Sequence, residues 1–287
     1  MSTCPLCSSA ATNWITIEGF PIDECCGCHH RFVAQGIGST HIAKVYSDAY
    51  FDAGGAGYKD YLGQEKLLQR RGLMYANLVS RLTGSKGVVL DVGAAAGFLM
   101  EGWESAGWQS IGVDPNNSMA KVAIGRGMKV HCGTFESLAI ADSNSMDCVA
   151  MVQVISHFIN PIQAIEKAFA LLRPGGTLLV ETWDRGSVMA RILGHGWHEY
   201  APPSVLHWFT PKSMNLAAQS KGFQLIRSRR VLRSINAGHA KSVLQYASSK
   251  SRIYSCARLM LHFVPDAVSV PYPGDDLFWT LYRKPTK

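Results

Sequence analysis

The sequence lacks long apolar runs, and this absence limits where the protein can reside. The most apolar stretch, IYSCARLMLHFV at 253–264, is shorter than the roughly 20 residues that cross a bilayer, and it contains Arg258 and His262. The opening residues, MSTCPLC, show neither the basic flank nor the apolar core of a signal peptide. We therefore expect a cytoplasmic protein without a transmembrane segment, whose cysteines stay reduced.

Internal repeats and low-complexity tracts are also missing, and acidic residues are scarce in one part of the chain. The 287 residues, 47% hydrophobic and 17% charged, suit one large globular domain with a small attachment. From Arg185 to the end there are 15 Lys and Arg but 4 Asp and Glu. This excess predicts either a solvated basic face or an anionic partner, such as a phosphorylated small molecule, a nucleic acid or a membrane surface.

Cysteines gather at the start of the chain, where five of the eight lie within the first 28 residues. Cys4 with Cys7 and Cys25 with Cys28 form two C-x2-C hooks, a spacing typical of a structural Zn²⁺ ribbon. Four thiolates would leave no position for water on the ion. The alternative is a pair of disulfides or idle thiols. Three neighbours lie close enough in sequence to replace a ligand: Cys26, His29 and His30.

Apolar runs and amphipathic segments alternate after residue 60. We expect helices at 62–82, 98–107, 118–127 and 161–172, and strands at 88–92, 108–114, 128–133, 146–154 and 177–183. Strands that are apolar throughout, alternating with helices, predict an α/β fold with a parallel sheet covered on both faces. The remaining expected elements are a helix at 211–221, a strand at 223–231, a basic helical segment at about 238–264 and a strand at 278–284.

The first of these strands, VVLDV, ends in Asp91 and leads into a turn of small residues, Gly93 to Gly97. A dinucleotide-binding loop has the pattern G-x-G-x-x-G, but here the middle glycine is missing and Ala95 stands between the other two. A carboxylate before the turn would repel a pyrophosphate and attract an ammonium group. The next strand ends in Asp114, which can accept hydrogen bonds from ribose hydroxyls. S-adenosylmethionine satisfies both carboxylates, with Asp91 near its amino group.

From about Tyr46 to its end the chain resembles the class I S-adenosylmethionine-dependent methyltransferases. DVGAAAG (91–97) matches the family's D-x-G-x-G-x-G loop except at Ala95, and GVDPN (112–116) matches the ribose-binding strand end. CGTFESL, VQVISHFINP and LLRPGGTLLVETW match later family segments in the same order. The resemblance implies a Rossmann-like fold with a seven-stranded, mostly parallel sheet. The cofactor-binding residues that it implies are Asp91, Gly93, Ala94, Ala95, Gly97, Asp114, Pro115, Thr134, Phe135 and Gln153.

These features divide the chain into three parts. We expect a zinc-binding ribbon at 1–40, an N-terminal helical cover at 41–85 and a methyltransferase domain at 86–287 with a basic insertion at about 231–270. Within the superfamily the chain resembles the bacterial group related to ubiquinone-biosynthesis O-methyltransferases. This implies O-methylation of a sugar, glycan, quinone precursor or secondary metabolite. The sequence leaves the acceptor atom (oxygen, nitrogen or carbon) and the oligomeric state open.

The acceptor side of the site is predicted from two segments. His157 follows the fourth strand of the domain and is the expected general base, because histidine has a suitable intrinsic pKa. The alternative is that His157 only orders its loop. Trp197 and His207 lie in the connection after the fifth strand, where they would shape a substrate pocket with His207 as a reserve base, or would only bury an insertion.

Two other functions compete with small-molecule methylation. An RNA methyltransferase with a zinc module would explain the basic excess, but the ribbon contains little positive charge beyond Arg31, which argues against a nucleic-acid partner. A non-catalytic scaffold that binds the cofactor is the other alternative. The basic segment could also contact a membrane surface.

Overall fold

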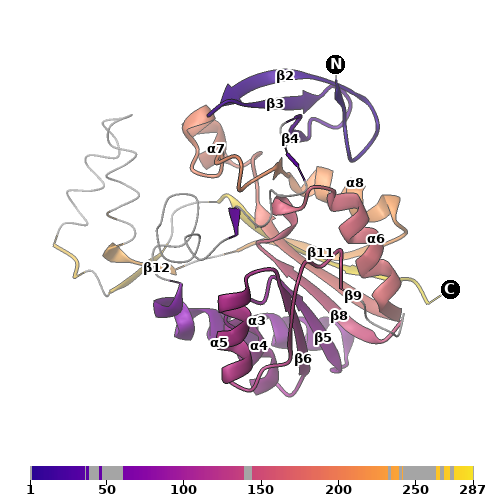
Figure 1. The fold of residues 1–287 in the computed structure, drawn as a ribbon, viewed down its shortest axis with the longest axis vertical. Coiled ribbons are helices and arrows are strands. Elements are labelled where there is room, and N and C mark those ends of the chain that lie inside the picture. Colours follow the sequence, from indigo (N-terminus) through magenta and orange to yellow (C-terminus); the bar gives the residue numbers. More distant parts are fainter. Residues whose placement is uncertain are drawn as a thin grey trace.

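The computed structural model describes residues 2–35, 37–38, 45–46, 61–138, 144–231, 234–238, 241, 263–265, 268–271 and 275–286. Within these residues a small N-terminal sheet sits against a larger α/β unit (Figure 1). Most of the predicted basic helical segment at 238–264 and most of the glycine-rich stretch at 46–61 lie outside the described residues. No helix in the described part of the chain is both long enough and apolar enough to span a membrane.

The larger sheet has seven strands in the order β11-β14-β9-β8-β5-β6-β7. Its five strands from β9 to β7 are parallel, and β14 runs antiparallel to both β9 and β11. The predicted α/β fold with a mostly parallel sheet is therefore confirmed. The strand bounds are β5 (Val88–Val92), β6 (Gln109–Asp114), β7 (Val130–Cys132), β8 (Met146–Val152), β9 (Leu172–Trp183), β11 (Gln224–Arg230) and β14 (Leu277–Arg283).

Helices cover both faces of this sheet (Figure 1). Neighbouring residues of β9 point to opposite faces, so Leu178 joins an apolar cluster with residues of α6 and α8, while Leu179 joins one with residues of α3 and α4. The α-helices are α3 (Glu65–Thr83), α4 (Phe98–Ser105), α5 (Asn117–Gly125), α6 (Pro161–Leu171), α7 (Val188–Leu193) and α8 (Pro211–Ser220). The short 3-10 helices are η1 (Leu62–Gln64), η2 (Ile155–His157) and η3 (Gly194–Gly196).

Side chains before the helices explain where several of them begin. Asn160 accepts a hydrogen bond from the backbone N–H of Gln163 at 3.1 Å, and Pro161 follows at the first position of α6. Thr210 and Ser213 form a reciprocal capping box at the start of α8. These helix starts lie within one residue of those predicted from the sequence.

The ends of two strands differ from the sequence-based prediction for a local reason that the structure shows. The strand expected at 146–154 ends at Val152, because Gln153 adopts a left-handed backbone with φ of 60°. The strand expected at 177–183 already begins at Leu172, which pairs with Met146 before the register shifts. The two glycines of LLRPGGTLLVETW lie in an irregularity between Leu172 and Thr177, where Gly175 has a φ of 79°.

The N-terminal part forms an antiparallel sheet in the order β1-β2-β3-β4-β10. Its first four strands are β1 (Ser2–Thr3), β2 (Ala10–Ile17), β3 (Phe20–Cys25) and β4 (Arg31–Val33). The fifth, β10 (His207–Trp208), comes from the connection after β9, so the ribbon and the larger domain share one sheet. Strand β12 (Ser234–Asn236) pairs separately with β13 (Ser269–Pro271).

Candidate functional site

The four predicted metal ligands lie together in the ribbon. The sulfur atoms of Cys4, Cys7, Cys25 and Cys28 all lie within 4.8 Å of one another, with Cys4 to Cys28 at 3.6 Å and Cys7 to Cys25 at 3.4 Å. Tetrahedral Zn²⁺ with Zn–S bonds of about 2.3 Å would hold its sulfurs about 3.8 Å apart. The Gly27 N–H lies 3.3 Å from the Cys25 sulfur and helps to hold the second hook. The geometry is therefore that of a four-thiolate metal site.

The three neighbours that could have replaced a ligand take other positions. Cys26 is exposed and outside the cluster. His29 lies 3.4 Å from the Glu24 carboxylate. The buried His30 contacts His207, with Nε2 and Nδ1 at 3.1 Å. The two C-x2-C hooks thus supply the four cysteines of the cluster without help from these residues.

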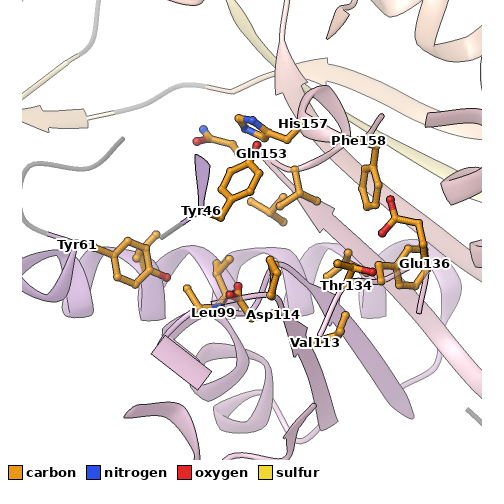
Figure 2. A pocket seen from close by; sticks show the side chains of 18 of the residues that line it. Tyr46, Tyr61, Leu99, Val113, Asp114, Thr134, Glu136, Gln153, His157 and Phe158 are labelled. Carbon is orange, nitrogen blue, oxygen red and sulfur yellow. Dashed lines mark hydrogen bonds between the residues drawn. The ribbon is translucent and has the colours of Figure 1, made fainter. Parts of the chain in front are cut away.

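A pocket opens at the carboxyl ends of β5, β6 and β8, where ligands of α/β sheets bind (Figure 2). Eight of the predicted site residues line it: Gly93, Ala95, Asp114, Pro115, Thr134, Phe135, Gln153 and His157. Figure 2 shows His157, Gln153 and Tyr46 close together on one side, and Thr134 and Glu136 away from them. Asp91, Ala94, Gly97, Trp197 and His207 are not among its lining residues.

The small-residue turn after β5 depends on its two glycines. Gly93 has a φ of 78°, and a Cβ atom there would lie 2.5 Å from Cγ1 of Val154. Gly97 has a φ of 80°, and a Cβ atom there would lie 2.9 Å from Cγ of Met128. Ala95 also takes a left-handed conformation, with a φ of 46°, at the position where the family pattern has glycine. The turn therefore exposes backbone to the pocket, at the cost of local strain in Ala95.

Two buried carboxylates stand at the ends of β5 and β6. Both oxygens of Asp114 accept backbone N–H groups at 2.8 Å, from Ala95 and Asn116. Among the residues that the structure describes, neither oxygen of Asp91 has a hydrogen-bond partner, and the residue is 1% exposed. Burial raises the pKa of Asp114 to about 6, and burial together with the nearby charge of Asp114 raises the pKa of Asp91 to about 7. Asp91 is thus a buried acid that a cationic group would satisfy.

His157 occupies the opposite side of the pocket from Asp114. Its Nδ1 lies 2.6 Å from the backbone carbonyl oxygen of Ser204, and the hydroxyl of Tyr46 donates to the same oxygen at 3.0 Å. The rings of Tyr46 and His157 meet edge to face, 5.8 Å apart. The carbonyl oxygen of Tyr46 in turn accepts the side-chain amide of Asn116 at 3.0 Å. Tyr46 therefore bridges the strand end at Asp114 and the histidine.

Sequence reasoning missed a buried cluster beside this pocket. Arg71 lines the pocket from α3 and pairs with Glu181, which is fully buried at the end of β9. The hydroxyl of buried Tyr75 donates to the same carboxylate. Burial and the charge of Glu181 raise the pKa of Tyr75, so its hydroxyl keeps its proton. The apolar spacing of α3 predicts that one face of this helix is buried. It does not indicate that Arg71 lies on that face and pairs with Glu181.

Trp197 and His207 lie elsewhere than expected. Trp197 is buried and donates its indole N–H to Asp276 at 2.8 Å. Burial lowers the pKa of His207 to about 4, and the ring is held against His30 of the ribbon. These residues belong to the contact between the ribbon and the connection after β9. Of the two predicted roles, their position corresponds to the second, in which these side chains bury the connection and do not shape a substrate pocket.

Comparison with known families identifies one match. A family model described as a methyltransferase domain matches residues 67–228, which is more than half of the chain. The matched range includes most of α3, the turn after β5, both carboxylates and His157. It begins after the ribbon.

Two curated proteins illustrate the similarity in sequence. A ubiquinone biosynthesis O-methyltransferase of Alkalilimnicola ehrlichii is 28% identical over 180 residues, covering 55% of this chain and 73% of the relative. One of the same description from Paraburkholderia phymatum is 29% identical over 163 residues, covering 50% of this chain and 69% of the relative.

Solved structures share the fold. A methyltransferase dependent on S-adenosylmethionine from Archaeoglobus fulgidus has a TM-score of 0.52 at 16% identity, covering 78% of this chain and 100% of that one. Phosphoethanolamine N-methyltransferase 2 of Haemonchus contortus, solved with S-adenosylmethionine, has a TM-score of 0.54 at 16% identity. That match covers 89% of this chain and 62% of the other.

Proposed function

Because the chain belongs to the methyltransferase domain family, we propose that it transfers the methyl group of S-adenosylmethionine to a hydroxyl group of a small molecule. The relatives described as O-methyltransferases support oxygen as the acceptor atom. The acceptor classes that we propose are a sugar, a glycan, a quinone precursor or a secondary metabolite. An acceptor with an anionic group would suit the basic C-terminal part of the chain.

The observation that carries this proposal is the unpaired, buried carboxylate of Asp91 close to that of Asp114. S-adenosylmethionine presents an ammonium group, a carboxylate and two ribose hydroxyls. Asp91 would take the ammonium group, and Asp114, already oriented by two backbone N–H groups, would accept the ribose hydroxyls. Arg71 at the pocket wall would take the carboxylate. Each polar part of the cofactor would thus meet a side chain of opposite charge or one that can accept its hydrogen bonds.

The adenine end would lie against Thr134 and Phe135. Phe135 is buried and meets Phe158 edge to face with ring centres 6.0 Å apart, which makes an apolar wall for a flat ring. The Thr134 hydroxyl accepts the backbone N–H of Ser137 at 3.2 Å, so this turn is already formed. Both residues line the pocket.

His157 is the proposed general base. When bound, S-adenosylmethionine supplies a methyl group that is electrophilic because its carbon is attached to a sulfonium. As the methyl group passes from the sulfur to the acceptor oxygen, His157 would take the hydroxyl proton. Tyr46, Gln153 and His157 lie near one another in the pocket, where they would align the acceptor (Figure 2).

The ribbon cysteines would hold one structural Zn²⁺. Thiolates would fill all four positions, so the ion would have no site for substrate or water. Metal analysis should give about one zinc per chain, and Cys4→Ser with Cys7→Ser should release it. The matched control is Cys26→Ser, which removes an exposed thiol outside the cluster and should keep the metal. A metal-free protein with an intact ribbon would refute the zinc assignment.

Mass spectrometry tests the reaction itself. Purified protein, S-adenosylmethionine and a small-metabolite extract should yield a product heavier by one methyl group, with S-adenosylhomocysteine formed in equal amount. Cofactor that binds but is not consumed with any extract would instead favour the scaffold alternative.

An RNA acceptor is the second candidate, supported by the overall basic charge. The ribbon argues against it, because Arg31 is bonded to Glu24 at 2.6 Å and stacked 3.5 Å from the Trp14 ring centre. Residues 1–35 contain no other Lys or Arg. A gel-shift series over salt separates the candidates, since phosphate contacts weaken steeply as salt rises. Absence of binding at modest ionic strength would exclude RNA.

A further inference from the structure

We propose that the N-terminal ribbon is a positioning element for His157. By holding the segment 204–208, it fixes the Ser204 carbonyl group that keeps the His157 ring in the tautomer needed to accept a proton. The inference rests on the proposed function, since it assumes that His157 is the base. The ribbon lies outside the matched methyltransferase domain, and the inference gives it a role in the catalytic step.

The first link is the hydrogen bond between His157 and Ser204. A carbonyl oxygen can only accept, so the Nδ1 atom that lies 2.6 Å from it must carry the hydrogen. In a neutral imidazole with hydrogen on Nδ1, the basic nitrogen is Nε2. The Ser204 carbonyl thus sets both the tautomer and the angle of the ring. Ser204 is 3% exposed, which protects this bond from competing water.

The second link joins the segment 204–208 to the ribbon and to the loop of the base. Leu206 donates its N–H to the carbonyl oxygen of Ser156, the residue before His157, at 2.9 Å. The carbonyl oxygen of Leu206 accepts the N–H of Val33, in β4, also at 2.9 Å. One residue therefore bonds the base's loop on one side and the ribbon on the other.

The ribbon also supplies the sheet partner of this segment. Strand β10 pairs His207 with Phe32 and Trp208 with Arg31, and β4 is its one neighbour in the sheet among the described residues. Arg31 further donates to the hydroxyl of Tyr200 at 2.6 Å. Without β4, the segment that carries Ser204 would lose its strand pairing and the packing of its aromatic residues.

The third link runs from the cysteine cluster to β4. Cys25 ends β3, Cys28 lies three residues before β4, and Cys25 donates its N–H to the carbonyl oxygen of His30 at 2.9 Å. A ribbon this small has little core of its own, so metal binding supplies much of its folding free energy. Loss of the metal should therefore release β4, and with it the Ser204 carbonyl.

The strands that carry the two carboxylates of the pocket do not pair with the ribbon. Asp91 and Asp114 sit on β5 and β6, whose strand partners all belong to the larger sheet. Disturbing the ribbon should therefore lower kcat and leave the dissociation constant of S-adenosylmethionine nearly unchanged. If the ribbon contributed only to global stability, its disturbance would change kcat and the dissociation constant together.

The first test reads the tautomer directly, in the full chain. Nitrogen-15 NMR of the histidine rings, with the His157 signals assigned by their loss in His157→Ala, should show hydrogen on Nδ1 in the wild type and in Cys26→Ser. In Cys4→Ser with Cys7→Ser, the same signals should shift toward a mixture of the two tautomers. An unchanged Nδ1–H pattern in the metal-free variant would overturn the inference.

The second variant, Val33→Pro, keeps every cysteine and removes only the N–H that bonds Leu206. The neighbouring Ala34 N–H bonds Pro21 on the other side of β4, at 3.0 Å, and is retained. Val33→Pro should keep its metal and show the same tautomer mixture. It keeps the inference testable if the cysteine variant fails to fold.

A kinetic cycle completes the experiment. Each ribbon variant should lower kcat at least about tenfold but by no more than His157→Ala does, and should add no further loss in the His157→Ala background. Losses that multiply across the two sites would overturn the inference. A normal kcat in His157→Ala would overturn the base role and this inference together. A low kcat in His157→Ala with an unchanged tautomer in the ribbon variants would overturn this inference alone.

Discussion

The two sides of the pocket are built in different ways. The cofactor side comes from consecutive strand ends and turns, with Asp91, Gly93 and Asp114 close in sequence as well as in space. The acceptor side brings together Tyr46, His157 and Ser204 from distant parts of the chain. Under the proposed function, the comparison teaches that cofactor binding would be encoded locally, whereas the acceptor side would depend on tertiary contacts that extend to the ribbon. Each prediction below tests one side against the other.

The largest expected effect is on the acceptor side. His157→Ala should lower kcat by roughly 10²–10⁴-fold, because the acceptor hydroxyl loses its base. S-adenosylmethionine should bind as before, and the loss should shrink at high pH, where the acceptor ionises unaided. His131→Ala, which changes an exposed histidine on β7 outside the pocket lining, is the control. Near-normal kcat with a raised KM would reduce His157 to a binding residue.

The next effect falls on the cofactor side. Asp114→Ala should weaken S-adenosylmethionine binding by about 1–3 kcal/mol in calorimetry, since charge-assisted hydrogen bonds to ribose are lost. At saturating cofactor, kcat should be largely retained. The affinity of Asp114→Asn, which keeps one acceptor oxygen, should fall between those of the wild type and Asp114→Ala. Equal affinity in Asp114→Ala would remove this residue from the site.

The pH dependence of cofactor affinity tests Asp91. Its pKa in the free protein is about 7, so the carboxylate that would pair with the ammonium group is mostly protonated at lower pH. The association constant should therefore rise by up to about tenfold per pH unit between pH 5.5 and pH 7 and then level off. Asp114, with a pKa of about 6, adds to the dependence only at the lower end of this range. Asp91→Asn should flatten the rise; an unchanged profile would contradict the pairing.

The smallest effect concerns the turn between the two carboxylates. Ala95→Gly should relieve the left-handed strain at φ of 46°, offset partly by the greater flexibility of glycine in the unfolded chain. The free energy of unfolding, from urea titration, should rise by no more than about 1 kcal/mol. Cofactor affinity should change little. A loss of stability would show that the Ala95 side chain contributes packing that outweighs its strain.

Much of the fold and of the cofactor side could be predicted from the sequence. Apolar runs that end in Asp91 and Asp114 indicate where the two strands lie and place a carboxylate at the end of each, and the spacing of the two cysteine hooks indicates the four members of the cluster. These signals are local, so neighbouring residues suffice to recognise them. The number of strands in the sheet is implied by the family resemblance, whereas the cluster of four cysteines follows from the spacing of the hooks.

The acceptor side could not be predicted in the same way. Ser204 acts through its backbone carbonyl, which every residue has, and the salt bridge of Arg71 to Glu181 joins a helix and a strand far apart in sequence. Trp197 and His207 resembled pocket residues because a buried aromatic looks the same in sequence whether it faces a ligand or another part of the fold. The pairing of β10 with β4 turns His207 toward the ribbon and away from the pocket, and no residue near position 207 indicates that pairing in the sequence.

Calorimetric titration of the purified protein with S-adenosylmethionine, and in parallel with NAD, tests the central claim most directly. The account predicts that S-adenosylmethionine binds at one site per chain near pH 7.5, that Asp91→Asn and Asp114→Ala each weaken it, and that NAD gives no heat of binding. Binding of NAD in place of S-adenosylmethionine, or equal affinity for S-adenosylmethionine in both variants, would contradict it.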